Sequence, residues 1–157
     1  MSYYNAIYSA TSDSDAFAAA GSIIEVQVPA NVQIEVLRAW VGPAEGTDPV
    51  NEVQEIALYV NDGVATAGTA LTEQELRGST DATSLCAALA APTIAATPVD
   101  LIFDAFHVQN GWLYLPVPEE RIRIAGGTTN DNVGLRFPVA PDASMTVSYG
   151  IIWGEMG

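Results

Sequence analysis

Hydrophobic and polar side chains alternate with a period of two along most of the chain, most clearly near its C-terminal end. In residues 144–155 five large apolar side chains share one parity, namely Met145, Val147, Tyr149, Ile151 and Trp153. Period-two alternation is typical of a β-strand with one buried face. We therefore expect this strand to run through the middle of a sheet and to form the floor of the core.

The same alternation predicts seven further strands from residue 22 onward. They are expected at residues 24–28, 32–41, 56–60, 106–108, 112–115, 122–124 and 133–137. Turn signals separate most of them, at a spacing of about 8–12 residues. This pattern predicts an all-β fold, an antiparallel sandwich, and about eight strands in two sheets is the number found in a jelly roll.

Asn110-Gly111 is the strongest hairpin signal in the chain, because this pair suits the positive φ angles of a two-residue turn. Such a turn would pair Gln109 with Trp112 and place four apolar side chains on the core face: Phe106, Val108, Leu113 and Leu115. The opposite face would display His107, Gln109, Trp112 and Tyr114. We interpret that face as a stacking platform for sugar or a contact patch for protein, and partial burial under residues 64–98 is the alternative.

The N-terminal segment lacks a sustained period and carries four aromatic side chains among small and polar residues: Tyr3, Tyr4, Tyr8 and Phe17. Aromatic residues are enriched at protein interfaces. We expect residues 1–20 to form an extended N-terminal arm that docks on a neighbouring subunit, and residues 21–157 to form a single sandwich domain. The alternative is a first strand that packs on its own domain.

Residues 64–98 are rich in Ala and Thr and poor in large apolar side chains. We expect a mostly irregular excursion between sheet segments with two short helices. The residues Thr72–Glu75 match a capping box for the first helix, and Asp81 is the candidate cap of the second. A long excursion of this kind either wraps a neighbour or is a plain surface connection.

Composition narrows the class of protein. A chain of 157 residues with 49% hydrophobic residues is expected to form one domain, and no apolar run approaches the ~20 residues of a membrane span. The first residues do not resemble a secretory signal. There are 19 acidic residues, five arginines and no lysine, which gives a net charge of −14. Such a chain would repel phosphate backbones and anionic lipids, so we expect neither nucleic acid nor membrane as a partner.

The sequence offers little for nucleophilic or metal chemistry. Cys86 and His107 are the single cysteine and the single histidine, so no internal disulfide and no four-ligand Cys/His zinc site is possible within one chain. The two residues could form a Cys–His dyad, but no flanking signature supports one, and Cys86 is expected to be a buried, inert thiol. The absence of lysine excludes Schiff-base chemistry. No glycine-rich phosphate loop is present.

Carboxylates are the remaining catalytic candidates. Glycosidases need two carboxyl groups at a defined separation, and Asp100 with Asp104 is the best pair by proximity, followed by Glu119 with Glu120. Solvated acids at strand ends are the simpler interpretation. Oxygen ligands suited to calcium gather at three places, namely Asp13/Asp15, Asn61-Asp62 and Asn130-Asp131-Asn132, but none matches an EF-hand loop. We expect no enzyme activity, no cofactor and no metal.

Three of the five arginines, Arg121, Arg123 and Arg136, fall on one predicted strand pair. In so acidic a chain they are candidates for charge-assisted contacts with carboxylates, either within the chain or on a partner.

The aromatic N-terminal segment MSYYNAIYSATSDSDAF, the sandwich pattern from residue 22 and the ending FPVAPDASMTVSYGIIWGE together resemble the small jelly-roll decoration (cement) proteins on the heads of tailed bacteriophages. The resemblance implies a non-enzymatic virion protein on the outer capsid surface. It also implies a homotrimer whose partner is the major capsid protein, and whose arms clamp neighbouring capsomers.

Three alternatives stay open at this point. One is a carbohydrate-binding β-sandwich module that uses His107, Trp112 and Tyr114. Another is a hydrolase that uses Asp100 and Asp104. The third is a tail or neck component of the virion, which the sequence does not distinguish from a head decoration protein.

Overall fold

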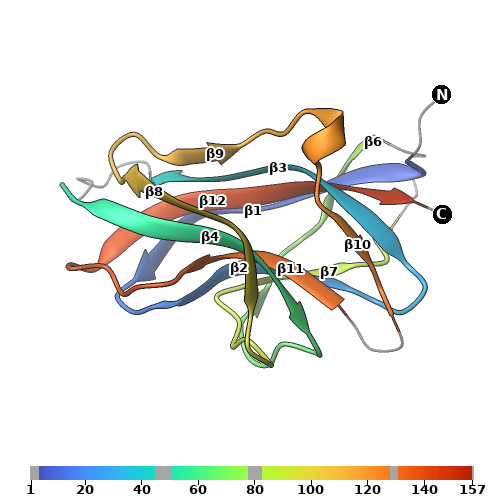
Figure 1. Ribbon diagram of the computed structural model, residues 1–157, viewed down its shortest axis with the longest axis horizontal. Helices are drawn as coiled ribbons and strands as arrows, with labels where there is room; N and C mark the ends of the chain where they lie inside the picture. Colours follow the sequence, from blue (N-terminus) through green and yellow to red (C-terminus); the bar gives the residue numbers. More distant parts are fainter. Residues whose placement is uncertain (1–3, 45–50, 78–82, 128–130, 157) are drawn as a thin grey trace.

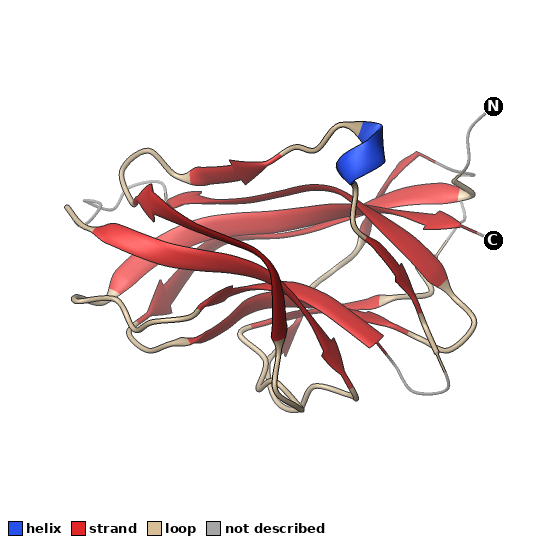
Figure 2. Ribbon diagram, in the orientation of Figure 1, coloured by secondary structure: helices blue, strands red, loops and turns tan. Residues whose placement is uncertain are grey.

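The computed structural model describes residues 4–44, 51–77, 83–127 and 131–156, which form two antiparallel β-sheets packed face to face (Figures 1 and 2). The first sheet contains β1 (Ala6–Phe17), β3 (Gln33–Pro43), β6 (Gln74–Arg77), β9 (Trp112–Tyr114), β10 (Arg123–Ala125) and β12 (Met145–Met156). Its strand order is β10-β3-β12-β1-β6, and β9 also pairs with β3.

The second sheet contains β2 (Gly21–Val28), β4 (Val53–Asp62), β5 (Thr69–Ala70), β7 (Ala87–Ala90), β8 (Val99–His107) and β11 (Asp131–Phe137). Its strand order is β5-β7-β2-β11-β4-β8. A single turn of 3₁₀ helix, η1 (Pro118–Glu120), lies between β9 and β10. Within the described ranges no helix is long and apolar enough to cross a membrane.

The order of the long strands is that of a jelly roll. In the first sheet β1, β12, β3 and the β9/β10 segment are neighbours, and in the second sheet β2, β11, β4 and β8 are neighbours. The chain passes from sheet to sheet between β1, β2, β3 and β4, and again on either side of β11, so few sequential strands form hairpins. This connectivity has the Greek-key character of jelly rolls. The predicted antiparallel sandwich is confirmed.

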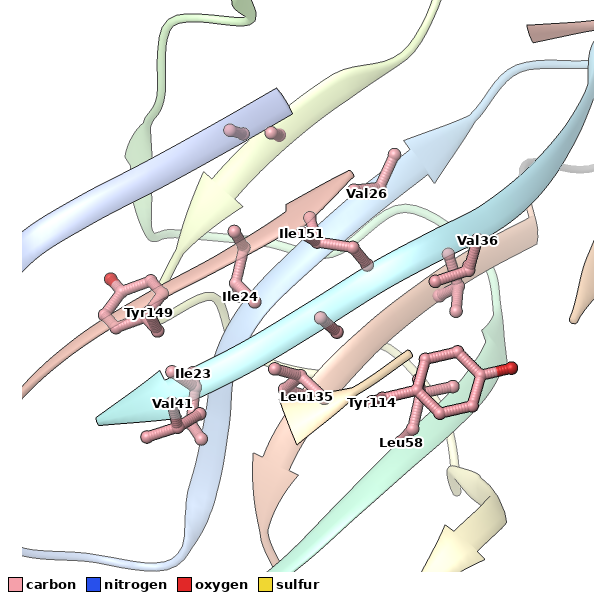
Figure 3. Close-up of a cluster of buried hydrophobic side chains, with 14 of the residues drawn as sticks. Ile23, Ile24, Val26, Val36, Val41, Leu58, Tyr114, Leu135, Tyr149 and Ile151 are labelled. Carbon is pink, nitrogen blue, oxygen red and sulfur yellow. The ribbon is translucent and has the colours of Figure 1, made fainter. Parts of the chain in front are cut away.

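β12 forms the floor of the core, as its alternation predicts. It lies between β3 and β1, and its five apolar side chains from Met145 to Trp153 are at most 2% exposed. Figure 3 shows Tyr149 and Ile151 of this strand in one cluster with Ile24 and Val26 of β2. Each such burial contributes roughly 1.5–3 kcal/mol to stability.

Two glycines on the opposite face of β12 make room for aromatic side chains from other segments. A Cβ atom at Gly150 would lie 2.3 Å from Trp40 Cζ2, and one at Gly154 would lie 2.4 Å from Tyr4 Cδ1. Trp40 and Tyr4 therefore lie flat against the outer surface of the first sheet, which a larger residue at either glycine position would prevent.

The prediction of an N-terminal arm is wrong for the part of the segment that the structure describes. Residues 6–17 form β1, which pairs with β12 on one side and with β6 on the other. The side chains of Tyr8 and Phe17 are buried in the core, and the ring of Phe17 contacts those of Phe137 and Tyr149. The boundary at residue 20 is thus not a domain boundary, and the alternative of a first strand is correct. Tyr3 lies outside the described residues.

The excursion at residues 64–98 contains strands where short helices were expected. The predicted capping box is absent, because residues 74–77 form β6, and the Glu73 carboxylate accepts a hydrogen bond of 2.8 Å from the Ala88 amide instead. The stretch expected to form the second helix includes β7 (Ala87–Ala90), which pairs with β2, and its candidate cap Asp81 lies outside the described residues. β6 and β7 extend the two sheets at the same side of the sandwich, beyond β1 and β2.

Candidate functional site

The turn at Asn110-Gly111 joins the two sheets and does not close a hairpin. β8 belongs to the second sheet and β9 to the first, so residues 108–111 carry the chain from one layer to the other. Amide groups of Asn110 and Gly111 donate to the His107 carbonyl at 2.9 and 3.2 Å, and Gly111 has a φ of +73°. The predicted turn is present, but the predicted strand pairing is wrong.

The inward and outward faces of β9 are consequently the reverse of those predicted. Trp112 and Tyr114 are each only 9% exposed, and Figure 3 shows Tyr114 among the core side chains. Their rings lie nearly parallel with centroids 6.5 Å apart. Leu113 and Leu115 point outward and are exposed. The proposed aromatic platform for sugar is therefore not on the surface.

His107 does not join Trp112 and Tyr114 in a common face. It ends β8 and is half-buried, and its Nε2 atom lies 2.9 Å from Asn51 Oδ1. Trp112 instead donates its indole N–H to Asp104 Oδ2 at 3.1 Å, which links β9 to β8 across the gap between the two sheets.

Exposed apolar side chains gather along β8, β9 and the residues up to η1. Six of the eleven large apolar side chains exposed in the described ranges come from this stretch: Val99, Leu101, Phe103, Leu113, Leu115 and Val117. Leu101 and Phe103 lie on the outer face of the second sheet and Leu113 and Leu115 on that of the first, and we call this edge of the sandwich the β8–β9 side. In Figure 1, β8 crosses in front of β4 and ends close to the start of β9. Apolar patches on a soluble domain commonly mark interaction sites.

The β8–β9 side also carries unpaired strand edges. β8 is the last strand of the second sheet, and in the described part of the chain β9 pairs with β3 alone. Each strand therefore presents a row of backbone groups that another strand can pair with. The nine residues of β8 contain no proline, while Asp100, Asp104 and the register shift opposite Leu58 and Tyr59 limit pairing along part of this edge.

On the opposite side of the sandwich the two sheets end in the edge strands β6 and β5. There β6 and β7 add to β1 and β2, and Glu155 anchors the chain that leads into β7. The Glu155 carboxylate accepts hydrogen bonds from Ser84 Oγ at 2.6 Å and from the Leu85 amide at 3.1 Å. The larger number of exposed apolar side chains makes the β8–β9 side the candidate functional surface.

The charged groups next to this surface have partners. Arg136 binds Asp100 in a bidentate pair with N–O distances of 2.8 and 2.7 Å, which raises the pKa of the Arg136 guanidinium. Asp104 accepts the Trp112 indole hydrogen bond. Paired charges cost less to cover than bare ones, so these carboxylates oppose a contact made there less than unpaired carboxylates would.

The remaining arginine candidates, Arg121 and Arg123, pair with a carboxylate of the same chain, which was one of the two predicted possibilities. Arg123 Nε lies 2.9 Å from Glu35 Oε1, and Arg121 Nη1 lies 3.5 Å from Glu35 Oε2. Arg121 Nη1 also donates to the Tyr4 hydroxyl at 2.8 Å. Tyr4 is thus held by the body of the domain, while Tyr8 and Phe17 are inside it.

The structure separates the residues considered for catalysis. Cys86 is buried, and its backbone amide donates hydrogen bonds to Ser84 Oγ and Glu155 Oε1. His107 contacts Asn51 instead. Burial, together with the nearby Glu155 carboxylate, raises the pKa of the Cys86 thiol far above its usual range. Asp100 and Asp104 bind Arg136 and Trp112 respectively and do not face one another across a common site.

Cation ligands do not converge in the part of the chain that the structure describes. No group of three or more His, Cys, Asp or Glu side chains there is arranged to hold a metal ion. Asp15, from one of the predicted calcium loops, accepts hydrogen bonds from Ser12 Oγ and from the Tyr149 hydroxyl. Asn130, from another, lies outside the described residues.

Comparisons with models of known protein families, with curated proteins and with solved structures found no match for this chain.

Proposed function

We propose that the chain is a non-enzymatic structural protein of a virion. In this proposal it binds the outer surface of a tailed-phage capsid as a homotrimer and stabilises the capsid by bridging neighbouring capsomers. The observation that carries the proposal is the β8–β9 side, where exposed apolar side chains accompany two unpaired strand edges. The jelly-roll connectivity agrees with the architecture of the decoration proteins that the sequence resembles.

The β8–β9 side is the capsid-facing surface of this proposal. The chain has a net charge of −14, so a contact with another protein is easiest where charges are few and already paired. On this side Asp100 is paired with Arg136 and Asp104 with Trp112, and the side chains around them are apolar. A typical specific interface takes about 800 Å² from each partner, so the contact would include residues beside β8 and β9 as well as the two strands.

Trimerisation would strengthen the same contact without adding a new one. Once one subunit of a trimer has bound the capsid, the other two subunits are held at a high effective concentration near their own binding sites. Three contacts of modest affinity therefore give a stable attachment. This mechanism does not require the N-terminal segment, which forms β1 within the domain.

A charge placed on the β8–β9 side tests the proposal. Phe103 is 57% exposed on β8, so Phe103→Asp should leave the fold intact and reduce binding to capsids at least tenfold. The measurement is co-sedimentation with heads assembled from the major capsid protein of the same genome. Leu85→Asp is the control in the same mixtures. Leu85 precedes β7 on the opposite side of the sandwich and is 67% exposed, so this variant should bind like the unchanged protein.

Three results would contradict this assignment. Binding retained by Phe103→Asp would exclude the β8–β9 side as the capsid-facing surface. A change in the oligomeric state of free Phe103→Asp, seen by sedimentation equilibrium, would make this side a contact between copies of the chain. Failure of the unchanged protein to sediment with heads would refute the capsid role itself.

A further inference from the structure

A cleft at the edge of the first sheet concentrates two of the five arginines of this acidic chain. Its walls are Tyr4, Glu35, Pro118, Arg121, Arg123 and Met156, and its volume is about 390 Å³. Volumes of this order are typical of sites for small ligands. We propose that this cleft binds a single carboxylate carried on an apolar stem. The proposal stands whether or not the chain decorates a capsid.

Strand register creates the cleft. Arg123 of β10 lies directly opposite Glu35 of β3, and Glu35 lies opposite Gly154 of β12. Because Gly154 has no side chain, the Tyr4 ring occupies the space above it. Arg121 precedes β10, and its Nη1 atom donates a hydrogen bond of 2.8 Å to the Tyr4 hydroxyl.

The guanidinium groups keep donors for a ligand after their internal contacts are made. Arg123 uses its Nε atom on Glu35, and within the described residues its two terminal nitrogens have no hydrogen-bond partner. Arg121 makes its contacts through Nη1, so its Nη2 atom has no hydrogen-bond partner in the same part of the chain, whereas its Nε is buried and out of reach of a ligand. A guanidinium offers five N–H donors in a planar fork that matches the two oxygens of a carboxylate.

Charge selects a monoanion. The two arginines and Glu35, whose side chain is only 4% exposed, leave one unbalanced positive charge in the cleft. A carboxylate neutralises that charge, whereas a phosphate dianion would leave an excess negative charge beside the buried Glu35. Pro118 and Met156 add apolar surface to the walls, which suits a hydrocarbon stem behind the carboxylate.

Three kinds of ligand carry such a carboxylate: a glutamate side chain of a protein, the free C-terminus of a protein and a small organic acid. The shared chemistry is a planar monoanion with a short aliphatic stem. We expect isolated stems of this size to bind weakly, with a Kd of about a millimolar, because a ligand of few atoms offers little contact area.

Arginine side-chain NMR on the full chain tests the site with sodium butyrate as the probe. Butyrate should give saturable shifts of the Arg121 and Arg123 Nε–H signals, and sodium chloride at equal ionic strength should not. Arg123→Gln should weaken butyrate binding at least fivefold. Arg38→Gln is the matched control, because it removes the same charge from an arginine that lies 5.1 Å above the Trp40 ring and outside the cleft, and it should bind butyrate normally.

A second variant tests the charge argument. Glu35→Gln raises the charge of the cleft by one, so it should bind butyrate more tightly and also bind inorganic phosphate, which the unchanged protein should not. An amidated peptide with one internal glutamate and an uncharged peptide with a free C-terminus then distinguish the two protein sources of the carboxylate, and binding of either supports the site. Equal shifts with chloride and butyrate, or butyrate binding unchanged in Arg123→Gln, would overturn the proposal.

Discussion

Glu25 places a carboxyl group where no solvent reaches it, on the outer face of the second sheet beneath the excursion. The Tyr59 hydroxyl donates to its Oε2 atom at 2.5 Å, and Ser22 Oγ lies 2.9 Å from that hydroxyl. Its Oε1 atom has no hydrogen-bond partner within the described ranges, nor has the Oδ1 atom of the buried Asn61. Burial raises the pKa of Glu25, and the neighbouring Tyr59 and Asn61 side chains oppose that rise only in part.

A raised carboxyl pKa in the folded state means that stability falls as pH rises. Below the ordinary value of 4.5 both the folded and the unfolded chain hold the proton on Glu25, so burial of the neutral group carries no ionisation cost. Between 4.5 and the raised folded value the unfolded chain releases its proton and the folded chain does not. Above the pKa of Glu25 in the folded chain, the stability contributed by the neutral carboxyl group is lost completely.

Glu25→Gln should therefore stabilise the protein at neutral pH. The amide keeps an acceptor for Tyr59, adds a donor that can serve the Asn61 Oδ1 atom, and carries no charge. We expect a free energy of unfolding about 1–3 kcal/mol higher than that of the unchanged protein at pH 7, and a much smaller difference at pH 4. Urea unfolding at the two pH values measures it, with Glu119→Gln in the exposed η1 as the control. An equal difference at both values would contradict the ionisation argument.

At the scale of elements, β1 is the segment whose role changes most between sequence and structure. It forms ten residue pairs with β12, and its Tyr8 ring packs against Trp153 with centroids 6.0 Å apart. It also separates β12 from β6, so its loss would expose both strands. A strand in this position is part of the folding unit and not an appendage.

Deleting residues 1–17 should abolish cooperative folding. The deletion removes a central strand and the core side chains of Tyr8 and Phe17, and loss of one such aromatic side chain alone costs about 3–5 kcal/mol. Thermal unfolding followed by circular dichroism is the measurement, and Thr11→Ala on the exposed face of β1 should unfold almost like the unchanged protein. A truncated chain with a cooperative transition would mean that the segment is an arm after all.

The elements that sequence predicts well are those whose large side chains alternate without interruption. β12 and β11 belong to this group, since their large buried apolar side chains share one parity and hence carry a local signal. The alternation of apolar and polar residues is weak in β1. Ala10 is a small core residue, and a register shift between Ser12 and Asp15 interrupts the alternation. β6 and β7 depend on the edges they join and not on their own composition.

The candidate sites depend on pairings that local sequence does not contain. The faces of β9 are set by the passage of the chain from one sheet to the other, so a register counted from Asn110-Gly111 gives the opposite result. The arginine cleft requires Glu35 and Arg123, 88 residues apart, to lie side by side. Sequence therefore predicts the fold class and the charged residues, whereas strand register decides which of them meet.

At the scale of the whole molecule, the exposed apolar side chains are distributed unevenly between the two sides of the sandwich. β6 and β7 pair with β1 and β2, and β6 and β5 end the two sheets there, while β8, β9 and the residues up to η1 carry six of the large apolar side chains exposed in the described ranges. A long apolar edge strand favours uncontrolled association unless a specific partner covers it. The β8–β9 side is suited to contact with a partner, and the capsid is the partner that we propose.

The most direct measurement is a cryo-EM reconstruction of tailed-phage heads from the same genome, mixed with this chain at saturating concentration. The account predicts density for trimers of the jelly roll on the outer capsid surface, each bridging neighbouring capsomers, with β8 and β9 against the capsid protein. Heads without bound density, or density in which the β8–β9 side faces solvent, would contradict it.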